Sequence, residues 1–146
     1  MPNRGAHLTP SPVLFAGDAV DLLELLKAGA RRSGATVVDG TTTDPARIVI
    51  VAIIGEGRRS SIAKAFAAIQ RLGRLVAADA ILIAVVQSGR ARFAPPRIQR
   101  FLSSEILFQI ALAVPHLVRR PRWSSFRRGS GLTALDAAGL RILRFG

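Results

Sequence analysis

Two uninterrupted apolar runs constrain the fold of this 146-residue chain more than any other feature. Residues from Ile48 to Ile54 and from Ile81 to Val86 are apolar, rich in β-branched side chains, and show no polar alternation. Such runs are typical of strands that are covered on both faces, as in a parallel sheet. Both fall short of the roughly 18–20 apolar residues that span a bilayer. We therefore predict two buried strands and no transmembrane segment.

Amphipathic segments alternate with these runs. Apolar residues at helical spacing, polar caps and terminating glycines define each segment. A proline inside the last segment indicates a kink or an end of that helix. We expect three helices: residues 19–33, with Asp18 as N-cap and Gly34 as terminator; residues 62–72, with Ser60 or Ser61 as cap and Gly73 as terminator; and a helix from Glu105 towards Val118, with Ser103 as cap and Pro115 as the interruption.

The remaining segments complete an α/β pattern. Residues 12–16 and 35–38 read as short strands, 133–138 as a helical turn, and the alternation of residues 140–145 as a half-exposed last strand. Strands that alternate with amphipathic helices favour a small single three-layer α/β domain with a mostly parallel sheet of four to five strands. We divide the chain into a flexible leader (1–12), an α/β core (13–118), a basic Arg/Trp loop (119–131), which forms a basic C-terminal extension, and a terminal turn and strand that pack on the core (132–146).

The charge of the chain is strongly asymmetric. The net charge is +12, and residues 90–146 contribute +9 of it, with eleven arginines against Glu105 and Asp136. An excess of this size requires an anionic partner or a solvent-facing surface. Arginine favours bidentate recognition of phosphate, although a biased coding composition also raises arginine, alanine and glycine together.

The densest basic segment interleaves arginines with aromatic side chains. Guanidinium groups neutralise phosphates, and an aromatic face stacks on an unpaired base. The same composition suits an anionic membrane surface, and a third interpretation packs Trp123 and Phe126 into the core. A second basic cluster comprises Arg90, Arg92, Arg97 and Arg100. The predicted nucleic-acid-binding residues are Arg119, Arg120, Arg122, Trp123, Arg127 and Arg128.

A glycine-containing loop joins the first buried run to the second helix. In this context a phosphate binds the free N–H groups of a helix N-terminus. The alternative phosphate-binding residues are Gly55, Gly57, Arg58, Arg59, Ser60 and Ser61. Within this loop, Gly57-x-x-x-Ser61-Ile62-Ala63 resembles the Gly-x-x-x-Gly-Ile-Gly turn of short-chain dehydrogenases, with two glycines replaced. The chain contains no tyrosine, so the Tyr-x-x-x-Lys catalytic pair of that family is absent.

Three carboxylates follow predicted strands, namely Asp18, Asp39 and Glu56. In a parallel sheet these residues lie at the carboxyl edge, where ligands bind, and carboxylate oxygens there can coordinate Mg²⁺. Their placement resembles that of receiver domains. However, Gly55 stands where that family keeps its phospho-acceptor aspartate, and the caps and turn of an ordinary α/β unit also explain all three residues.

His7 and His116 have no partner at ligand or triad spacing, and the chain has no cysteine. We therefore assign neither a metal site nor a catalytic residue, and the sequence identifies no cofactor.

Three hypotheses for function follow. The first is a non-enzymatic module that binds a polyanion, RNA or DNA above all, through the arginine-rich segment. The second is a domain, enzyme or not, that binds a nucleotide or phosphate at the loop of residues 55–61. The third is a fragment or unselected reading frame without a function of its own. The leader contains no apolar signal segment, so we expect a cytoplasmic protein. The sequence does not define an oligomeric state.

Overall fold

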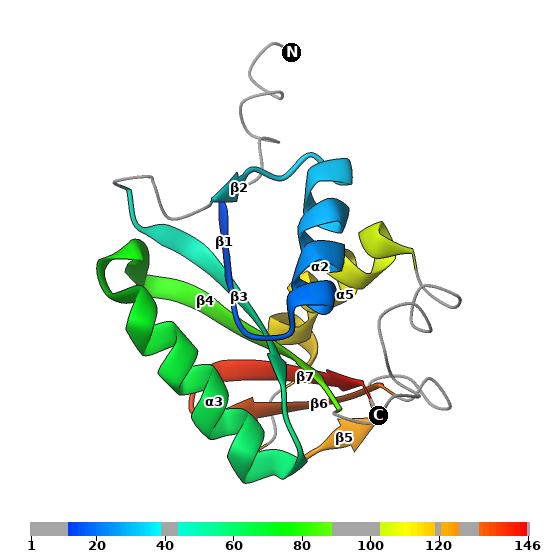
Figure 1. The fold of residues 1–146 in the computed structure, drawn as a ribbon. Helices are drawn as coiled ribbons and strands as arrows, with labels where there is room; N and C mark the ends of the chain where they lie inside the picture. The colour runs from blue at the N-terminus through cyan, green and yellow to red at the C-terminus, as the bar shows by residue number, and fades with distance from the viewer. Residues whose placement is uncertain (1–11, 39–43, 89–102, 119–120, 126–131, 146) are drawn as a thin grey trace.

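One mixed sheet, covered by helices on both faces, forms the centre of the structure (Figure 1). The computed structural model describes residues 12–38, 44–88, 103–118, 121–125 and 132–145. Within these residues the strand order is β2-β1-β3-β4-β7-β6-β5. The strands are β1 (Val13–Ala16), β2 (Val37–Val38), β3 (Ala46–Ile54), β4 (Val76–Gln87), β5 (Ser124–Ser125), β6 (Leu132–Ala137) and β7 (Leu140–Phe145). The helices are α2 (Val20–Arg32), α3 (Gly57–Leu72), which runs into a 3₁₀ turn at Gly73–Leu75, and α5 (Ser104–Leu117).

The predicted three-layer α/β class is confirmed. Strands β2, β1, β3, β4 and β7 are parallel, whereas β6 runs antiparallel to β7, and β5 antiparallel to β6. Helices α2 and α5 lie on one face of the sheet and α3 on the other (Figure 1). The described sheet has seven strands, more than the expected four to five, although β2 and β5 are only two residues long.

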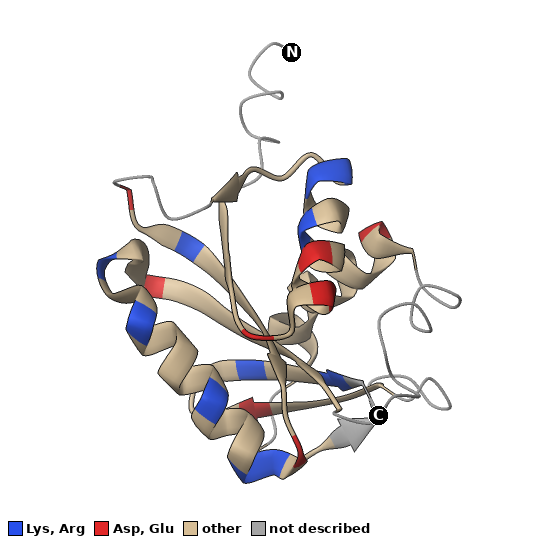
Figure 2. Cartoon of the chain, in the orientation of Figure 1, with Lys and Arg blue, Asp and Glu red and all other residues tan. Residues whose placement is uncertain are grey.

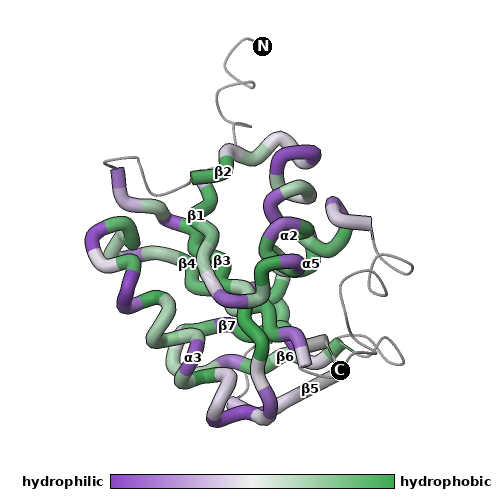
Figure 3. Tube along the Cα trace, viewed as in Figure 1, coloured by the Kyte–Doolittle hydropathy of each residue, from purple (hydrophilic) through white to green (hydrophobic). Residues whose placement is uncertain are grey.

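Strand β3 shows why the first apolar run has no polar alternation. Successive side chains of a strand point to opposite faces, and both faces of β3 are covered. Ile50 and Ala52 belong to the core under α2 and α5, whereas Val49, Val51 and Ile53 belong to the core under α3. All five are buried, so an apolar residue is required at every position (Figure 3).

Helices α2 and α5 pack closely against each other at Gly29. A Cβ atom at this residue would lie 2.0 Å from the carbonyl oxygen of Ser104, so only glycine permits the observed approach of the two backbones. The Arg32 guanidinium donates a hydrogen bond of 2.8 Å to the Ser104 hydroxyl nearby. The predicted cap of α5 is confirmed, because the Ser103 hydroxyl accepts a bond of 3.2 Å from the N–H of Ile106.

The helical turn predicted for residues 133–138 is wrong, because this segment forms strand β6 and a hairpin with β7. The two turn residues, Ala138 and Gly139, have φ values of 50° and 89°, and positive φ at both positions is what a type I′ hairpin requires. Asn-Gly or Asp-Gly is the usual signal of such a turn, and alanine gives none. The Asp136 carboxylate supports the turn instead, since it accepts a hydrogen bond of 3.1 Å from the N–H of Gly139.

The last strand is not half-exposed as expected. Strand β7 lies between β4 and β6 inside the sheet, and Leu140, Ile142 and Leu143 are buried. Its alternation reflects two arginines that are only partly exposed, Arg141 and Arg144. Arg141 forms an ion pair of 2.7 Å with Asp136, its register partner on β6. Strand β4 starts at Val76, within residues 75–80, where the sequence shows no clear pattern.

We expect Gly29→Ala to destabilise the protein by about 1–3 kcal/mol, as overpacking of a core does. In an exposed helix the same change stabilises by about 1 kcal/mol. A loss of stability in this protein would therefore show that Gly29 is in close contact with Ser104. Chemical denaturation measures the effect. Ala28→Gly on the same helix is the control for helix propensity alone. An unchanged or raised stability of Gly29→Ala would show that the two helices do not approach this closely.

Candidate functional site

The carboxyl ends of β1, β3 and β4 meet at one edge of the sheet, because these strands are parallel. The chain leaves β1 into α2 on one face and leaves β3 into α3 on the other (Figure 1). The strand order therefore reverses between β1 and β3. In open α/β sheets, ligands bind in the crevice at such a reversal, and we accordingly place the candidate site here.

The loop after β1 is pressed onto β3. Gly17 has φ 129°, and a Cβ atom on it would lie 1.8 Å from the carbonyl oxygen of Ala52. The N–H of Ala19 donates a hydrogen bond of 3.2 Å to the same oxygen. No other residue type fits at Gly17, since both the backbone conformation and the space exclude a side chain. This contact holds the next residue, Asp18, over the end of β3.

Asp18 joins three elements at this edge, and it does not cap α2 as predicted. Helix α2 begins at Val20, and the residue at its N-cap position, Ala19, makes no side-chain cap. One carboxylate oxygen of Asp18 accepts a hydrogen bond of 3.0 Å from the N–H of Ile54, and the other forms an ion pair of 2.7 Å with Lys64. The Lys64 ammonium also donates to the carbonyl oxygen of Ile54. The predicted cap is therefore a junction between β1, β3 and α3.

Two opposing effects act on the pKa of the Asp18 carboxyl. Partial burial is the largest single effect and raises the pKa. The hydrogen bond from Lys64, the backbone N–H of Ile54 and the positive charge of Lys64 all lower it, and together they prevail. The pKa of Asp18 therefore lies below its ordinary value of 3.8, and the folded protein favours the ionised form.

Helix α3 begins at Gly57, several residues before the start predicted from its serines. Ser60 and Ser61 lie inside the first turns and do not cap the helix. The Ser61 hydroxyl is buried and donates a hydrogen bond of 2.6 Å to the carbonyl oxygen of Gly57. A Cβ atom on Gly55 would lie 2.8 Å from that hydroxyl, so glycine leaves the space for it. Of the six predicted phosphate-binding residues, Gly55 and Ser61 thus serve the packing of the loop.

The first turn of α3 carries charge of the sign that the helix dipole disfavours. Arg58 and Arg59 are exposed there, no acidic residue lies in the turn, and Glu56 at the N-cap makes no side-chain cap. In contrast, α2 has Asp21 and α5 has Glu105 in the first turn (Figure 2). The positive end of α3 therefore has two guanidinium groups beside backbone N–H groups that no cap side chain satisfies.

The carboxylates at this edge do not form a metal site in the described part of the chain. Asp39 lies outside the described residues. Asp18 is engaged by Lys64, and Glu56 accepts a long hydrogen bond of 3.4 Å from Ser88 after β4. No group of three or more His, Asp or Glu side chains suited to a metal is found among the residues described.

The predicted nucleic-acid-binding segment is described only in part. Arg119, Arg120, Arg127 and Arg128 lie outside the described residues, as do His7 and the second basic cluster. Arg122 is exposed. Trp123 is half-buried against the core under α3, and the Arg144 guanidinium lies over its ring, 4.3 Å from the ring centre. This packing corresponds to the interpretation in which the tryptophan joins the core.

Sequence reasoning missed Lys64 and Arg144. Lys64 occupies an ordinary helical position, and only the fold brings it to Asp18, 46 residues earlier. Arg144 lies in an alternating strand, where an exposed arginine is the usual interpretation. The one available signal was charge, because α3 contains basic residues and no acidic one.

Comparison with known proteins yields no significant match to the chain, whether with protein-family models, curated proteins or solved structures. Among the residues that the structure describes, no helix combines the length and the apolar character needed to cross a membrane. The functional argument consequently depends on the geometry and charge of the site.

We expect the Asp18 carboxylate to stabilise the fold in a pH-dependent way. Because its folded pKa lies below 3.8, the contribution is fully present above that value and is lost as the pH falls through the folded pKa. Asp18→Asn should lower the free energy of unfolding at pH 7 by about 1 kcal/mol or less, since the pair is half-exposed. In chemical denaturation, the difference in unfolding free energy between wild type and variant should be smaller at pH 2.5 than at pH 7. Asp79→Asn, at an exposed position on β4, is the control, and a difference independent of pH would contradict the junction.

We expect Trp123→Ala to lower the free energy of unfolding by about 1–3 kcal/mol, less than a fully buried tryptophan would. Arg122→Ala, at the exposed neighbouring position, should change it by no more than about 0.5 kcal/mol. Thermal and chemical denaturation compare the two variants. Equal stabilities of Trp123→Ala and wild type would place the tryptophan outside the core.

Proposed function

We propose that this domain binds the phosphate backbone of a nucleic acid, with the first turn of α3 as one contact surface. The exposed Arg58 and Arg59 at the positive end of that helix are the observation that carries the proposal. Each cation at such a position costs about 0.3–1 kcal/mol against the helix dipole. A bound phosphate reverses that cost, because it accepts hydrogen bonds from free N–H groups and pairs with both guanidinium groups.

The exposure of these groups favours a polymer over a small ligand. Small molecules bind in concave sites that enclose most of their surface, whereas Arg58, Arg59 and Ser60 are all exposed. Arg71 and Arg74 extend the positive charge to the far end of α3 (Figure 2). A helix of 16 residues is about 24 Å long, which exceeds the spacing of successive phosphates several-fold.

The arginine-rich segment supplies the second contact in this proposal. Its support is the charge of +9 on residues 90–146 and the exposure of Arg122. The contacts we assign to Arg119, Arg120, Arg122, Arg127 and Arg128 are phosphate contacts, which do not read the base sequence. Because Arg144 already covers one face of Trp123, we assign base stacking at that residue only to the opposite face.

We expect binding to labelled single-stranded and duplex oligonucleotides to weaken steeply with salt, as measured by fluorescence anisotropy. Each phosphate contact adds about 0.7–0.9 to the slope of log K against log salt. Arg58→Ala with Arg59→Ala should therefore lower the slope by about 1.5 and the affinity at low salt about tenfold or more. Arg127→Ala with Arg128→Ala should act in the same direction.

The matched control is Arg71→Ala with Arg74→Ala, which removes the same charge from the opposite end of α3. Its effect should be smaller, because the C-terminal end of α3 adds charge but offers a phosphate neither free N–H groups nor the positive end of the helix dipole. Equal losses from both double variants would show that net charge alone drives binding, and salt-independent binding would refute the proposal. Stronger binding to phosphatidylserine vesicles than to oligonucleotides would point to a membrane surface as the polyanion.

The reversal of strand order between β1 and β3 supports a second candidate, the binding of a free nucleotide or phosphate at the same edge. Thermal shift assays with ATP, NAD and inorganic phosphate test it. Stabilisation by a mononucleotide that Gly57→Val abolishes, without oligonucleotide binding, would favour this candidate over the first. Gly57 has φ 72°, so a β-branched residue there disturbs the loop.

A further inference from the structure

Helix α5 exposes an apolar stripe in addition to the face that it buries. Its buried face consists of Leu107, Phe108, Ala111 and Val114. The second stripe, here called the α5 seam, consists of Ile106, Ile110, Ala113 and Leu117. Ile106 is 51% exposed and Leu117 is 64% exposed, whereas Ile110 and Ala113 are half-buried. Helix α5 is apolar along most of its length (Figure 3), and a helix that is apolar on most of its sides is usually covered on more than one of them.

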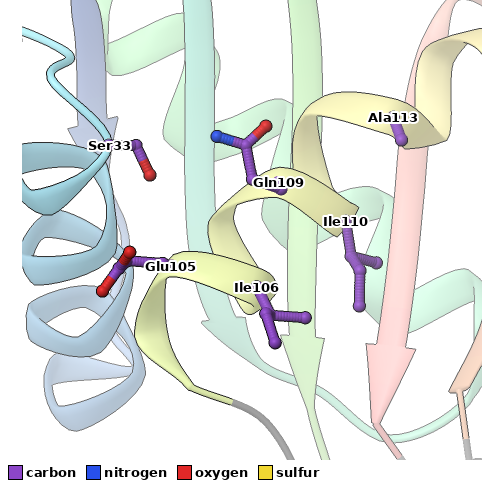
Figure 4. Close-up of a pocket in the computed structure, with 6 residues that line it drawn as sticks. All are labelled: Ser33, Glu105, Ile106, Gln109, Ile110 and Ala113. Carbon is purple, nitrogen blue, oxygen red and sulfur yellow. The ribbon is translucent and has the colours of Figure 1, made fainter.

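The spacing of the α5 seam is that of a helix–helix interface. Its members follow one another at intervals of four, three and four residues, which is the a/d spacing of packed helices. Ile106 and Ile110 point to the same side of α5 (Figure 4). Beside them runs a shallow depression, which is lined by Ser33, Glu105, Ile106, Gln109, Ile110 and Ala113. The seam therefore has the spacing of a helix–helix contact, and the depression lies along Ile106, Ile110 and Ala113.

We infer that the α5 seam binds the α5 seam of a second copy of this chain, with the two helices antiparallel about a two-fold axis. In this arrangement Ile106 faces Leu117 of the second copy, and Ile110 faces Ala113. The large and small side chains at the centre are complementary, so the two helices can approach closely. An interface about a two-fold axis makes each contact twice, which is why one short stripe suffices on each copy.

The acidic and basic side chains at the two ends of α5 favour the antiparallel arrangement. Glu105 lies in the first turn and His116 in the last. Antiparallel pairing brings Glu105 of each copy towards His116 of the other and opposes the two helix dipoles favourably. Parallel pairing would instead place the two Glu105 carboxylates side by side.

The interface is small, so we expect a dimer that dissociates on dilution. Helix α5 has 14 residues and is about 21 Å long, and a seam of this length buries less than the roughly 1,200–2,000 Å² of a standard stable interface. Sedimentation velocity of the full chain should therefore show an average mass that rises from one towards two copies of 15.6 kDa as the concentration increases.

Ile106→Glu with Leu117→Glu should leave a monomer at every concentration, and circular dichroism checks that the variant remains folded. Both positions are exposed, so the domain does not depend on them for its core. Val20→Glu, at a residue of α2 that is 63% exposed, is the matched control and should dimerise like wild type. A wild-type chain that is monomeric throughout, or a Val20→Glu variant that loses the dimer equally, would overturn the inference.

Engineered disulfides test the direction of the pairing, because the natural chain has no cysteine. Ile106→Cys with Leu117→Cys should form a cross-linked dimer on oxidation. Neither single variant should do so, because the axial distance between identical positions would be about 16 Å, too far for a disulfide. The same distance prevents a bridge within one helix. Efficient cross-linking of Ile106→Cys alone would overturn the antiparallel arrangement, and no cross-linking of the double variant would overturn the interface.

Discussion

The burial of β3 on both faces is the constraint on which the rest of this structure depends. An apolar strand at the centre of a sheet needs a helical layer on each side, and α2 with α5 supplies one layer while α3 supplies the other. The backbone of β3 also receives the loop after β1, at Gly17. The carboxyl edge is therefore built directly on the core, and its loops keep a defined position relative to the strands.

The charged side chains at the carboxyl edge of the sheet fall into two groups, those that hold elements together and those that are exposed to solvent. The Asp18 carboxylate is held by Lys64 and by the backbone of Ile54, so it serves the junction between elements. Arg58 and Arg59 form no ion pair with another residue of the described part of the chain, and both are exposed at the positive end of α3. The polyanion binding that we propose would use these exposed cations, and the net charge of +12 favours association with an anion in general.

Much of the fold was predictable, because burial leaves a direct mark on the sequence. The two apolar runs became β3 and β4, the helix predicted for residues 19–33 became α2, and the Ser103 cap was found where expected. The start of α3 was not predictable from its serines, because Ser61 bonds to the backbone inside the helix. Strand β6 was missed because its turn uses an alanine at positive φ, for which the sequence carries no signal. Residues 55–61 follow β3 and enter α3 as predicted, but their division into packing residues and exposed arginines was not foreseen, and their binding of phosphate stays a prediction.

The sequence by itself determined the α/β class, the two central strands and the surplus of arginine, since each follows from composition and from patterns among neighbouring residues. Only the tertiary structure decided the strand order, the place of β7 inside the sheet, the pairing of Asp18 with Lys64 and the packing of Arg144 on Trp123. These are contacts between residues far apart in the chain. Periodicity records which face of an element is buried, but not which other element covers it.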